Sequence, residues 1–139
     1  MAAITTSDIV AVAEFRAALR QFLRRTERIA RQSGLTPQRY LLLLMVRGAA
    51  DGSEQSTVTE LSERLQLAQS TVTELVSRAE ESGLIEREQS QTDARVAHLR
   101  LTEEGDRRLM QAFTGLATER SNLRNAFTHL DAEIPEELS

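Results

Sequence analysis

The middle of the chain, residues 56–105, carries two short helical patterns followed by two strand-like runs. Thr57-Val58-Thr59-Glu60 fits a capping box, in which the threonine hydroxyl accepts from the backbone three residues on and the glutamate reaches back. A helix is therefore predicted to begin there, and a second one is predicted over about 68–82, before Gly83. Apolar residues recur at helical spacing in this second helix and are predicted to form its inward face. They are Val72, Leu75, Val76 and Ala79.

The two strand-like runs lie at 84–89 and 96–101 and flank a polar tip, residues 90–95. Two short helices followed by a hairpin are typical of a winged helix-turn-helix, an arrangement that binds duplex DNA. The sequence therefore predicts a mainly α fold with a small β-hairpin wing, an α+β protein. The lone His98 lies within a predicted strand and is expected to be a half-buried structural residue.

A long amphipathic helix is predicted at the N-terminal end, over 7–32. Ser7 or Thr6 is expected to cap it and Gly34 to end it. Its apolar or neutral positions alternate three and four apart, which is the spacing of a helix-packing seam. These positions are Val12, Phe15, Leu19, Phe22, Thr26 and Ile29.

The last long helix is predicted over 103–131, with Thr102 as its cap. Its seam is interrupted only by Arg120 and consists of Leu109, Phe113, Leu116, Arg120, Leu123, Phe127 and Leu130. Two helices with such packing seams, at opposite ends of a small chain, favour self-association, although they could instead pack on each other within one subunit. The residues predicted to form a dimer contact are Val12, Phe15, Leu19, Phe22, Leu116, Leu123, Phe127 and Leu130.

The length of 139 residues suits one domain, 1–139, built as two lobes. The predicted winged lobe spans 36–105, and the helices 7–33 and 103–131 are predicted to form a dimerisation lobe. Thr36-Pro37 is expected to open a core helix that is apolar from residue 40 to residue 46, because a capping hydroxyl followed by proline suits a first turn. Residues 48–56 are rich in Gly, Asp and Ser and are predicted to form a loop.

The amino-acid composition and the absence of certain motifs exclude several classes of function. The chain has no cysteine and only two histidines, so we expect no disulfide, no metal site and no cofactor. No apolar run is long enough to span a bilayer, and residues 1–10 lack the basic start of a secretory signal, so we expect a soluble, cytoplasmic protein without membrane contact. No nucleophile elbow, phosphate-binding glycine loop or acid/base cluster is present, which argues against an enzyme.

The distribution of charge is the main argument against DNA binding. The net charge is −4, and residues 57–105 hold five arginines against ten acids, whereas residues 1–50 hold eight arginines against three acids. All 17 basic residues are arginine, a side chain that suits bidentate contacts to phosphate and guanine. We therefore expect the positive potential for DNA to be concentrated at Arg78, Arg87 and Arg95, with help from the N-terminal lobe.

A ladder of like charges recurs every fourth residue along the N-terminal helix. Such a ladder mildly destabilises an isolated helix and is most simply a solvated face. Alternatively, it meets acids on another segment, a partner subunit or a small anionic ligand. Its members are Arg16, Arg20, Arg24 and Arg28.

The outer face of the second short helix carries the predicted base-reading residues. Short or forked polar side chains in its N-terminal half suit base edges in the major groove, although an ordinary hydrated surface has the same composition. The candidates are Gln69, Ser70, Thr71, Thr73, Glu74, Ser77 and Arg78.

The hairpin supplies the second group of predicted DNA contacts. An arginine at its tip suits the narrow minor groove, and a carboxylate two residues earlier can hold that arginine in position. Arg95 and Asp93 fit these roles, although an isolated surface ion pair would look the same. The wing candidates are Arg87, Gln91, Asp93 and Arg95.

In order and spacing, residues 35–130 resemble the MarR family of bacterial winged-helix regulators. The matching pieces are Leu35-Thr36-Pro37-Gln38 with Tyr40, Thr57-Val58-Thr59-Glu60-Leu61-Ser62-Glu63-Arg64-Leu65, Ser70-Thr71-Val72-Thr73 with Leu75-Val76, Gly83-Leu84-Ile85-Glu86-Arg87, Asp93-x-Arg95, and Leu101-Thr102-x-x-Gly105. The resemblance implies a homodimer joined through its N- and C-terminal helices. It also implies recognition helices in successive major grooves of a pseudo-palindromic operator, and wings in the flanking minor grooves.

The same resemblance implies a repressor, often relieved by a small aromatic or phenolic effector bound between the dimer helices and the winged lobe. No motif transfers an effector site to particular residues of this chain. Our alternative is a winged helix used for protein contact without direct DNA binding, which the acidic segment 57–105 would favour. Exposed aromatic or aliphatic side chains in place of the polar face 69–78 would be more typical of such a module. A helical scaffold that merely dimerises would leave the hairpin tip without a role.

The sequence departs from the family pattern at four places. Gln66 stands where the family often has glycine, so the turn between the two short helices is expected to need a less favourable backbone geometry. Ala94 replaces a frequent arginine in the wing, and Glu74 occupies a position that is often basic. Glu74 could accept from a cytosine amino group or repel phosphate. Ile134-Pro135 is predicted to curtail the terminal helix.

Overall fold

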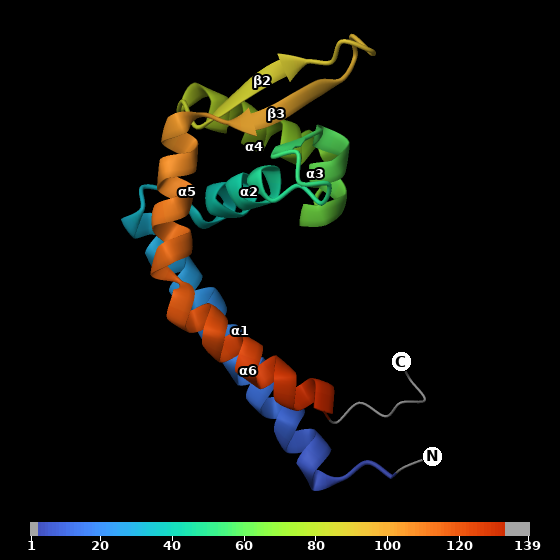
Figure 1. Ribbon diagram of the computed structural model, residues 1–139, viewed down its shortest axis with the longest axis vertical. Helices are drawn as coiled ribbons and strands as arrows, with labels where there is room; N and C mark the ends of the chain where they lie inside the picture. The colour runs from blue at the N-terminus through green and yellow to red at the C-terminus, as the bar shows by residue number, and fades with distance from the viewer. Residues whose placement is uncertain (1–2, 133–139) are drawn as a thin grey trace. The chain divides into compact units, whose positions relative to one another are not determined.

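The chain divides into two compact units (Figure 1). The computed structural model describes residues 3–132. We call residues 30–113 the central unit, and residues 1–29 together with 114–139 the terminal unit. Helix α1 (Thr6–Gln32) belongs mainly to the terminal unit, and α5 (Glu103–Gly115) belongs mainly to the central unit. The predicted interruption at Ile134-Pro135 lies outside the described residues.

The central unit combines short helices with a three-stranded antiparallel sheet. Its elements, in chain order before α5, are α2 (Pro37–Arg47), β1 (Gln55–Ser56), α3 (Val58–Leu65), α4 (Gln69–Glu81), β2 (Ile85–Gln89) and β3 (Ala97–Leu101). The strand order is β1-β3-β2, with β2 and β3 forming the hairpin (Figure 1). The structure thus confirms the mainly α fold with a β-hairpin wing.

One strand lies where the sequence pattern predicts only a loop. Gln55 and Ser56 pair with Arg100 and Leu99 of β3, so the end of the predicted loop 48–56 is β1. A strand of two residues is too short for an alternating pattern to show, and only the partner strand defines it. This pairing gives β3 a neighbour on both sides.

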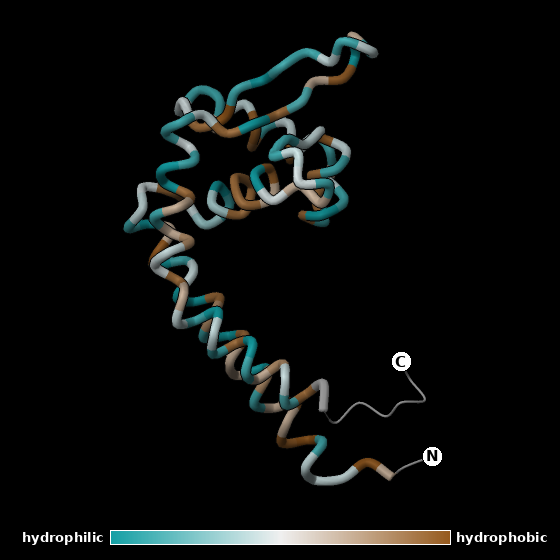
Figure 2. Tube along the Cα trace, in the orientation of Figure 1, coloured by the Kyte–Doolittle hydropathy of each residue, from teal (hydrophilic) through white to brown (hydrophobic). Residues whose placement is uncertain are grey.

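The core of the central unit gathers around α2, whose hydrophobic stretch is visible in Figure 2. Leu42, Leu43 and Val46 of α2 are completely buried. Other elements contribute further fully buried side chains. The apolar faces predicted for separate segments therefore pack into one hydrophobic core. These side chains include Leu61, Val72, Val76, Ala79, Leu84 and Leu99.

The predicted helix caps are confirmed at three helices. The Thr36 hydroxyl accepts from the Arg39 amide at 3.2 Å, and Thr102 accepts from Gly105 at 3.0 Å. At α3, Thr57 accepts from the Glu60 amide at 3.2 Å while the Glu60 carboxylate accepts from the Thr57 amide at 3.1 Å. This reciprocal pair is the predicted capping box, and it fixes where α3 begins.

The predicted cap of α1 is wrong. Neither Ser7 nor Thr6 caps the helix; instead Thr5 accepts from the Asp8 amide at 3.2 Å, and the Asp8 carboxylate accepts from the Thr5 amide at 2.8 Å. Thr5 has an acid three residues on, which completes a reciprocal cap, whereas Thr6 and Ser7 are followed at that spacing by isoleucine and valine. The predicted end is confirmed, because Gly34 adopts φ +78° just after α1.

The predicted helix 103–131 is two helices in the structure. Helix α5 ends at Gly115 and α6 (Ala117–Ala132) begins after Leu116. Glycine is a poor helix former, and Leu116 is completely buried, so tertiary packing rather than a continuous seam decides the path here. The sequence pattern did not predict this break, because the apolar residues keep their helical spacing on both sides of it.

In the terminal unit, α1 and α6 pack on each other within one subunit. The Phe15 and Phe127 rings meet edge to face with centroids 6.1 Å apart. Arg25 Nε lies 3.4 Å from the Glu119 carboxylate. The intramolecular packing that the sequence left open is therefore present.

A left-handed residue forms the turn between α3 and α4. Gln66 has φ 56° and ψ 45°, and its amide donates to the Ser62 carbonyl. Its side-chain Nε2 donates to the Glu63 carbonyl at 2.6 Å, a local bond that helps hold the strained residue. The expected unfavourable geometry of this turn is confirmed.

We predict that Gln66→Gly is more stable than Gln66→Ala by about 1 kcal/mol, because only glycine adopts this backbone region without steric cost. Both variants lose the side-chain bond, so their comparison isolates the backbone. Urea unfolding measures the difference. At the exposed α3 position Glu63 the order should reverse, with Glu63→Ala more stable than Glu63→Gly. Equal stability of the two Gln66 variants would contradict the left-handed turn.

Gly105 allows the first turn of α5 to lie directly against the backbone before β2. A Cβ added there would lie 2.1 Å from the Leu84 carbonyl oxygen. That carbonyl accepts from the Thr102 amide at 3.0 Å, and the Thr102 hydroxyl donates to the Gly83 carbonyl at 2.6 Å. These bonds hold the two backbones at a separation that excludes any side chain at Gly105.

We predict that Gly105→Ala destabilises the fold by about 3 kcal/mol, because the rigid backbone of Leu84 cannot move aside as a side chain would. Chemical denaturation followed by circular dichroism measures the loss. Gly115→Ala is the control, since its Cβ would meet only the flexible Ile29 side chain at 3.1 Å. An unchanged midpoint for Gly105→Ala would show that the close approach is not required.

Candidate nucleic-acid interface

Helix α4 has one buried face and one polar, exposed face. Val72, Val76 and Ala79 are completely buried, which fixes the rotation of the helix about its axis. Ala68 occupies the N-cap position and makes no side-chain cap bond. Of the predicted base-reading residues, Ser77 is half-buried and the others are exposed, namely Gln69, Ser70, Thr71, Thr73, Glu74 and Arg78.

Helix α3 contributes a bond to the start of this face. The Gln69 side-chain nitrogen lies 3.4 Å from the Thr59 hydroxyl, so the first residue of α4 is tied to the preceding helix. Sequence reasoning missed Thr59 because its partner lies ten residues away, beyond any helical spacing. The contact orients one candidate side chain before any ligand is present.

The wing tip is a compact turn. The Ser90 amide donates to the Val96 carbonyl at 2.9 Å, and the Ser90 hydroxyl accepts from the Asp93 amide at 3.3 Å. The Gln89 side-chain amide donates to the carbonyl of Ala94. Gln91 is exposed at this tip, and His98 in β3 is half-buried, as the sequence predicted.

Asp93 holds Arg95 as the spacing predicted. One carboxylate oxygen accepts from the Arg95 amide at 3.0 Å and from its Nε at 3.3 Å. The Arg95 side chain is nevertheless 91% exposed. An ion pair this open adds little stability, but it restricts where the guanidinium lies.

The other two arginines expected to attract DNA also have carboxylate partners. Arg78 Nη2 lies 2.8 Å from Glu74, and Arg87 Nη2 lies 2.6 Å from Glu80. Hydrogen bonds that Arg87 donates to the Glu80 carboxylate raise the pKa of Arg87 above its ordinary value, because they stabilise the charged form. Sequence reasoning missed Glu80, which lies on α4 while Arg87 lies on β2, so only the fold brings the two together.

These pairs change the expected electrostatics. Each of Arg78, Arg87 and Arg95 is partly neutralised by an acid of the central unit itself, which accounts for part of the acidic excess of residues 57–105. A phosphate would have to compete with these carboxylates. That the three arginines line one face stays a prediction.

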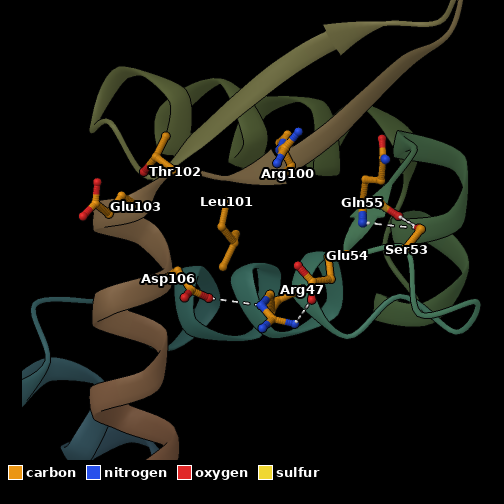
Figure 3. A pocket seen from close by; sticks show the side chains of 9 residues that line it. All are labelled: Arg47, Ser53, Glu54, Gln55, Arg100, Leu101, Thr102, Glu103 and Asp106. Atoms are coloured by element: carbon orange, nitrogen blue, oxygen red, sulfur yellow. Dashed lines mark hydrogen bonds and ion pairs between the residues drawn. The ribbon is translucent and has the colours of Figure 1, made fainter.

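A hollow of about 250 Å³ lies between α2, β3 and the start of α5 (Figure 3). Arg47 stands at its edge and bridges Glu54 at 2.9 Å and Asp106 at 3.1 Å. Arg100, Glu103 and Gln55 add further polar groups, and Leu101 is its apolar member. Within the described chain no group of three or more His, Cys, Asp or Glu is placed to hold a metal ion.

The predicted dimer residues differ in exposure. Leu116 is completely buried, so it belongs to the protomer's own core and offers no surface to a partner. Val12 and Phe127 are 48% and 53% exposed, and the remaining members are half-buried, namely Phe15, Leu19, Phe22, Leu123 and Leu130. The role of these seven residues in a dimer stays a prediction.

The arginine ladder of α1 is exposed along its whole length, from Arg16 to Arg28. Within residues 3–132, the ion pair between α1 and α6 is made by Arg25, which is not a member of the ladder. The exposure of the ladder agrees with a solvated face, and its pairing with a partner subunit or an anionic ligand stays a prediction. Over the same part of the chain, no helix is both long enough and apolar enough to cross a membrane.

Comparison with known proteins identifies the family to which this chain belongs. A family model described as MarR family matches residues 33–96. YsmB of Bacillus subtilis strain 168, an uncharacterized HTH-type transcriptional regulator, is 31% identical over 106 residues, which cover 76% of this chain and 68% of that protein. An alignment of this length and identity supports the assignment of this chain to the same family as its relative.

Solved structures share the fold. AbsC, a MarR family transcriptional regulator from Streptomyces coelicolor, is 20% identical with a TM-score of 0.64, over 99% of this chain and 88% of its own. The M. tuberculosis transcriptional regulator MosR, solved in complex with DNA, is 25% identical with a TM-score of 0.60, over 79% of this chain and 77% of its own. Family model, relative and fold agree with the motifs of the central unit: the chain belongs to the MarR family of transcriptional regulators, which are not enzymes.

Proposed function

We propose that this regulator is a homodimer that binds a pseudo-palindromic duplex operator and represses transcription from it. In this proposal α4 enters the major groove and the wing enters the adjacent minor groove. The observation that carries it is the exposed polar face of α4, combined with a wing tip where Asp93 holds an exposed Arg95. The likeness to MosR, whose structure contains DNA, supports the same reading.

The ion pairs of the interface favour a moderate affinity for DNA. Arg87 and Arg95 must exchange or share a carboxylate partner when a phosphate approaches, so each contact gains less than a free arginine would. Two linked half-sites would compensate, because the second head binds at a high effective concentration. A dimer therefore suits this interface better than a monomer.

The terminal unit offers apolar surface for such a dimer. Val12, Leu23 and Phe127 are each about half exposed or more, at 48%, 52% and 53%. Apolar surface of this kind on packed helices is typical of a partner contact. The intramolecular contact between α1 and α6 leaves it uncovered within the subunit.

A small aromatic or phenolic effector that relieves repression is part of the proposal. Effector binding would lower DNA affinity by favouring a separation of the two heads that does not match the operator. The hollow beside Arg47 is lined mainly by charged and polar side chains, which do not suit an aromatic ring. Such a compound should therefore be sought outside this hollow.

We predict that Arg95→Ala weakens binding to all duplexes similarly and lowers the salt dependence of log K by about one unit per protomer, because one phosphate-proximal charge is lost. Mobility shifts across salt concentrations, with DNA from upstream of the protein's own coding region, measure both effects. Arg124→Ala removes the same charge from an exposed position on α6 and should leave binding unchanged.

Absent or salt-independent binding by well-folded parent protein would overturn the DNA proposal. It would favour the alternative of a winged helix that contacts another protein. Binding by Arg95→Ala that equals the parent would overturn only the role of the wing.

We predict that Val12→Glu shifts the protein from dimer to monomer and reduces operator affinity by at least tenfold, because a carboxylate buried at an apolar contact is costly. Light scattering after size exclusion, at several concentrations, measures the mass. Ala13→Glu adds the same charge at the next exposed position of α1, which faces away from the seam, and should remain dimeric. A monomeric parent, or a dimeric Val12→Glu, would contradict this interface.

A further inference from the structure

Glu74 stands near the centre of the exposed face of α4, where a carboxylate is unexpected. Ser70 and Ser77 lie one turn before and after it on the same side of the helix. Glu74 is the single acid between Gln69 and Arg78. In a major groove a carboxylate is repelled by the phosphates on both sides, so its presence requires a compensating partner.

Arg78 supplies part of that compensation. Its Nη2 lies 2.8 Å from one Glu74 oxygen, and both side chains are 64% exposed. The carboxylate has a second oxygen, and a guanidinium carries five N–H donors, so both groups retain the capacity to bond a base. Together they present one acceptor beside several donors, with no net charge.

The edge of a C·G base pair is the complement of this arrangement. In the major groove it offers the cytosine N4 amino donor next to the guanine O6 and N7 acceptors. An A·T pair instead places its amino group between two acceptors and adds the thymine methyl, so a carboxylate oxygen there would face repulsion. The pattern of donors and acceptors therefore discriminates between the two base pairs.

We propose that Glu74 and Arg78 form one recognition unit that reads a C·G base pair in each half-site, with Glu74 accepting from cytosine N4 and Arg78 donating to guanine. The inference rests on the proposed function, because it requires α4 to lie in the major groove. It makes Glu74 a specificity-determining residue rather than a source of repulsion alone.

The test begins with enrichment of duplexes from a randomised double-stranded DNA pool by the parent protein. Mobility shifts then compare the enriched duplex with its single base-pair variants. The parent should lose roughly ten- to hundredfold in affinity for each C·G pair at this position that becomes A·T. Glu74→Gln should lose that preference at this position and favour adenine, because glutamine pairs with adenine N6 and N7.

Glu81→Gln is the matched control. Glu81 is exposed on the same helix seven residues further on, which is two turns along the same face, and its substitution removes the same charge. It should change affinity for all duplexes by one common factor and leave base preference unaltered. Thermal unfolding of both variants checks that the fold is unaffected.

The outcomes separate this inference from the proposed function. If Glu74→Gln changes affinity for every duplex by one common factor, as Glu81→Gln should, then Glu74 only repels phosphate and the recognition unit is refuted. The same conclusion follows if the parent binds duplexes with salt dependence but without a C·G preference. If the parent enriches no duplex at all, the proposed function itself fails.

Discussion

The burial of one face of α4 is the constraint on which the interface depends. Val72, Val76 and Ala79 are completely buried, and this fixes the rotation of the helix about its axis. The side chains opposite them are therefore exposed because of packing rather than by any property of their own. A change in the volume of these core residues would rotate the polar face, so the specificity of such a regulator is linked to its hydrophobic interior.

The arginines of the central unit are held by acids of the same unit, which bears on how an acidic protein would bind a polyanion as proposed. Glu80 pairs with Arg87 across two elements, and Glu74 pairs with Arg78 along one helix. Such pairs hold the cations in place and lower their net attraction for any phosphate. Tight binding to arbitrary DNA is thereby reduced, while contacts that depend on exact geometry keep their value.

Much of the fold follows from local patterns in the sequence. The capping box at Thr57 and the cap at Thr102 were predictable because each depends on residues within a few positions of one another. The unfavourable turn at Gln66 was expected instead from the resemblance to the MarR family, which often has glycine there. The strand at Gln55 was not predictable, because it is defined by its pairing with β3 far along the chain. The helix break at Leu116 was not predicted either, because the apolar spacing runs through it without interruption. For the candidate interface, the Asp93 to Arg95 contact was predictable from spacing, whereas the acid beside Arg87 required the sheet to pack on α4.

The hold that Asp93 exerts on Arg95 has a consequence for the entropy of binding. A free arginine loses many rotamers when it is fixed in a groove, at a cost of about 1 kcal/mol. Arg95 already has its backbone amide and its Nε bonded to one carboxylate oxygen, so part of that freedom is lost before a ligand arrives. The wing thus presents a preorganised cation, and in the proposed complex the entropic cost of fixing Arg95 would be smaller than for an unrestrained side chain.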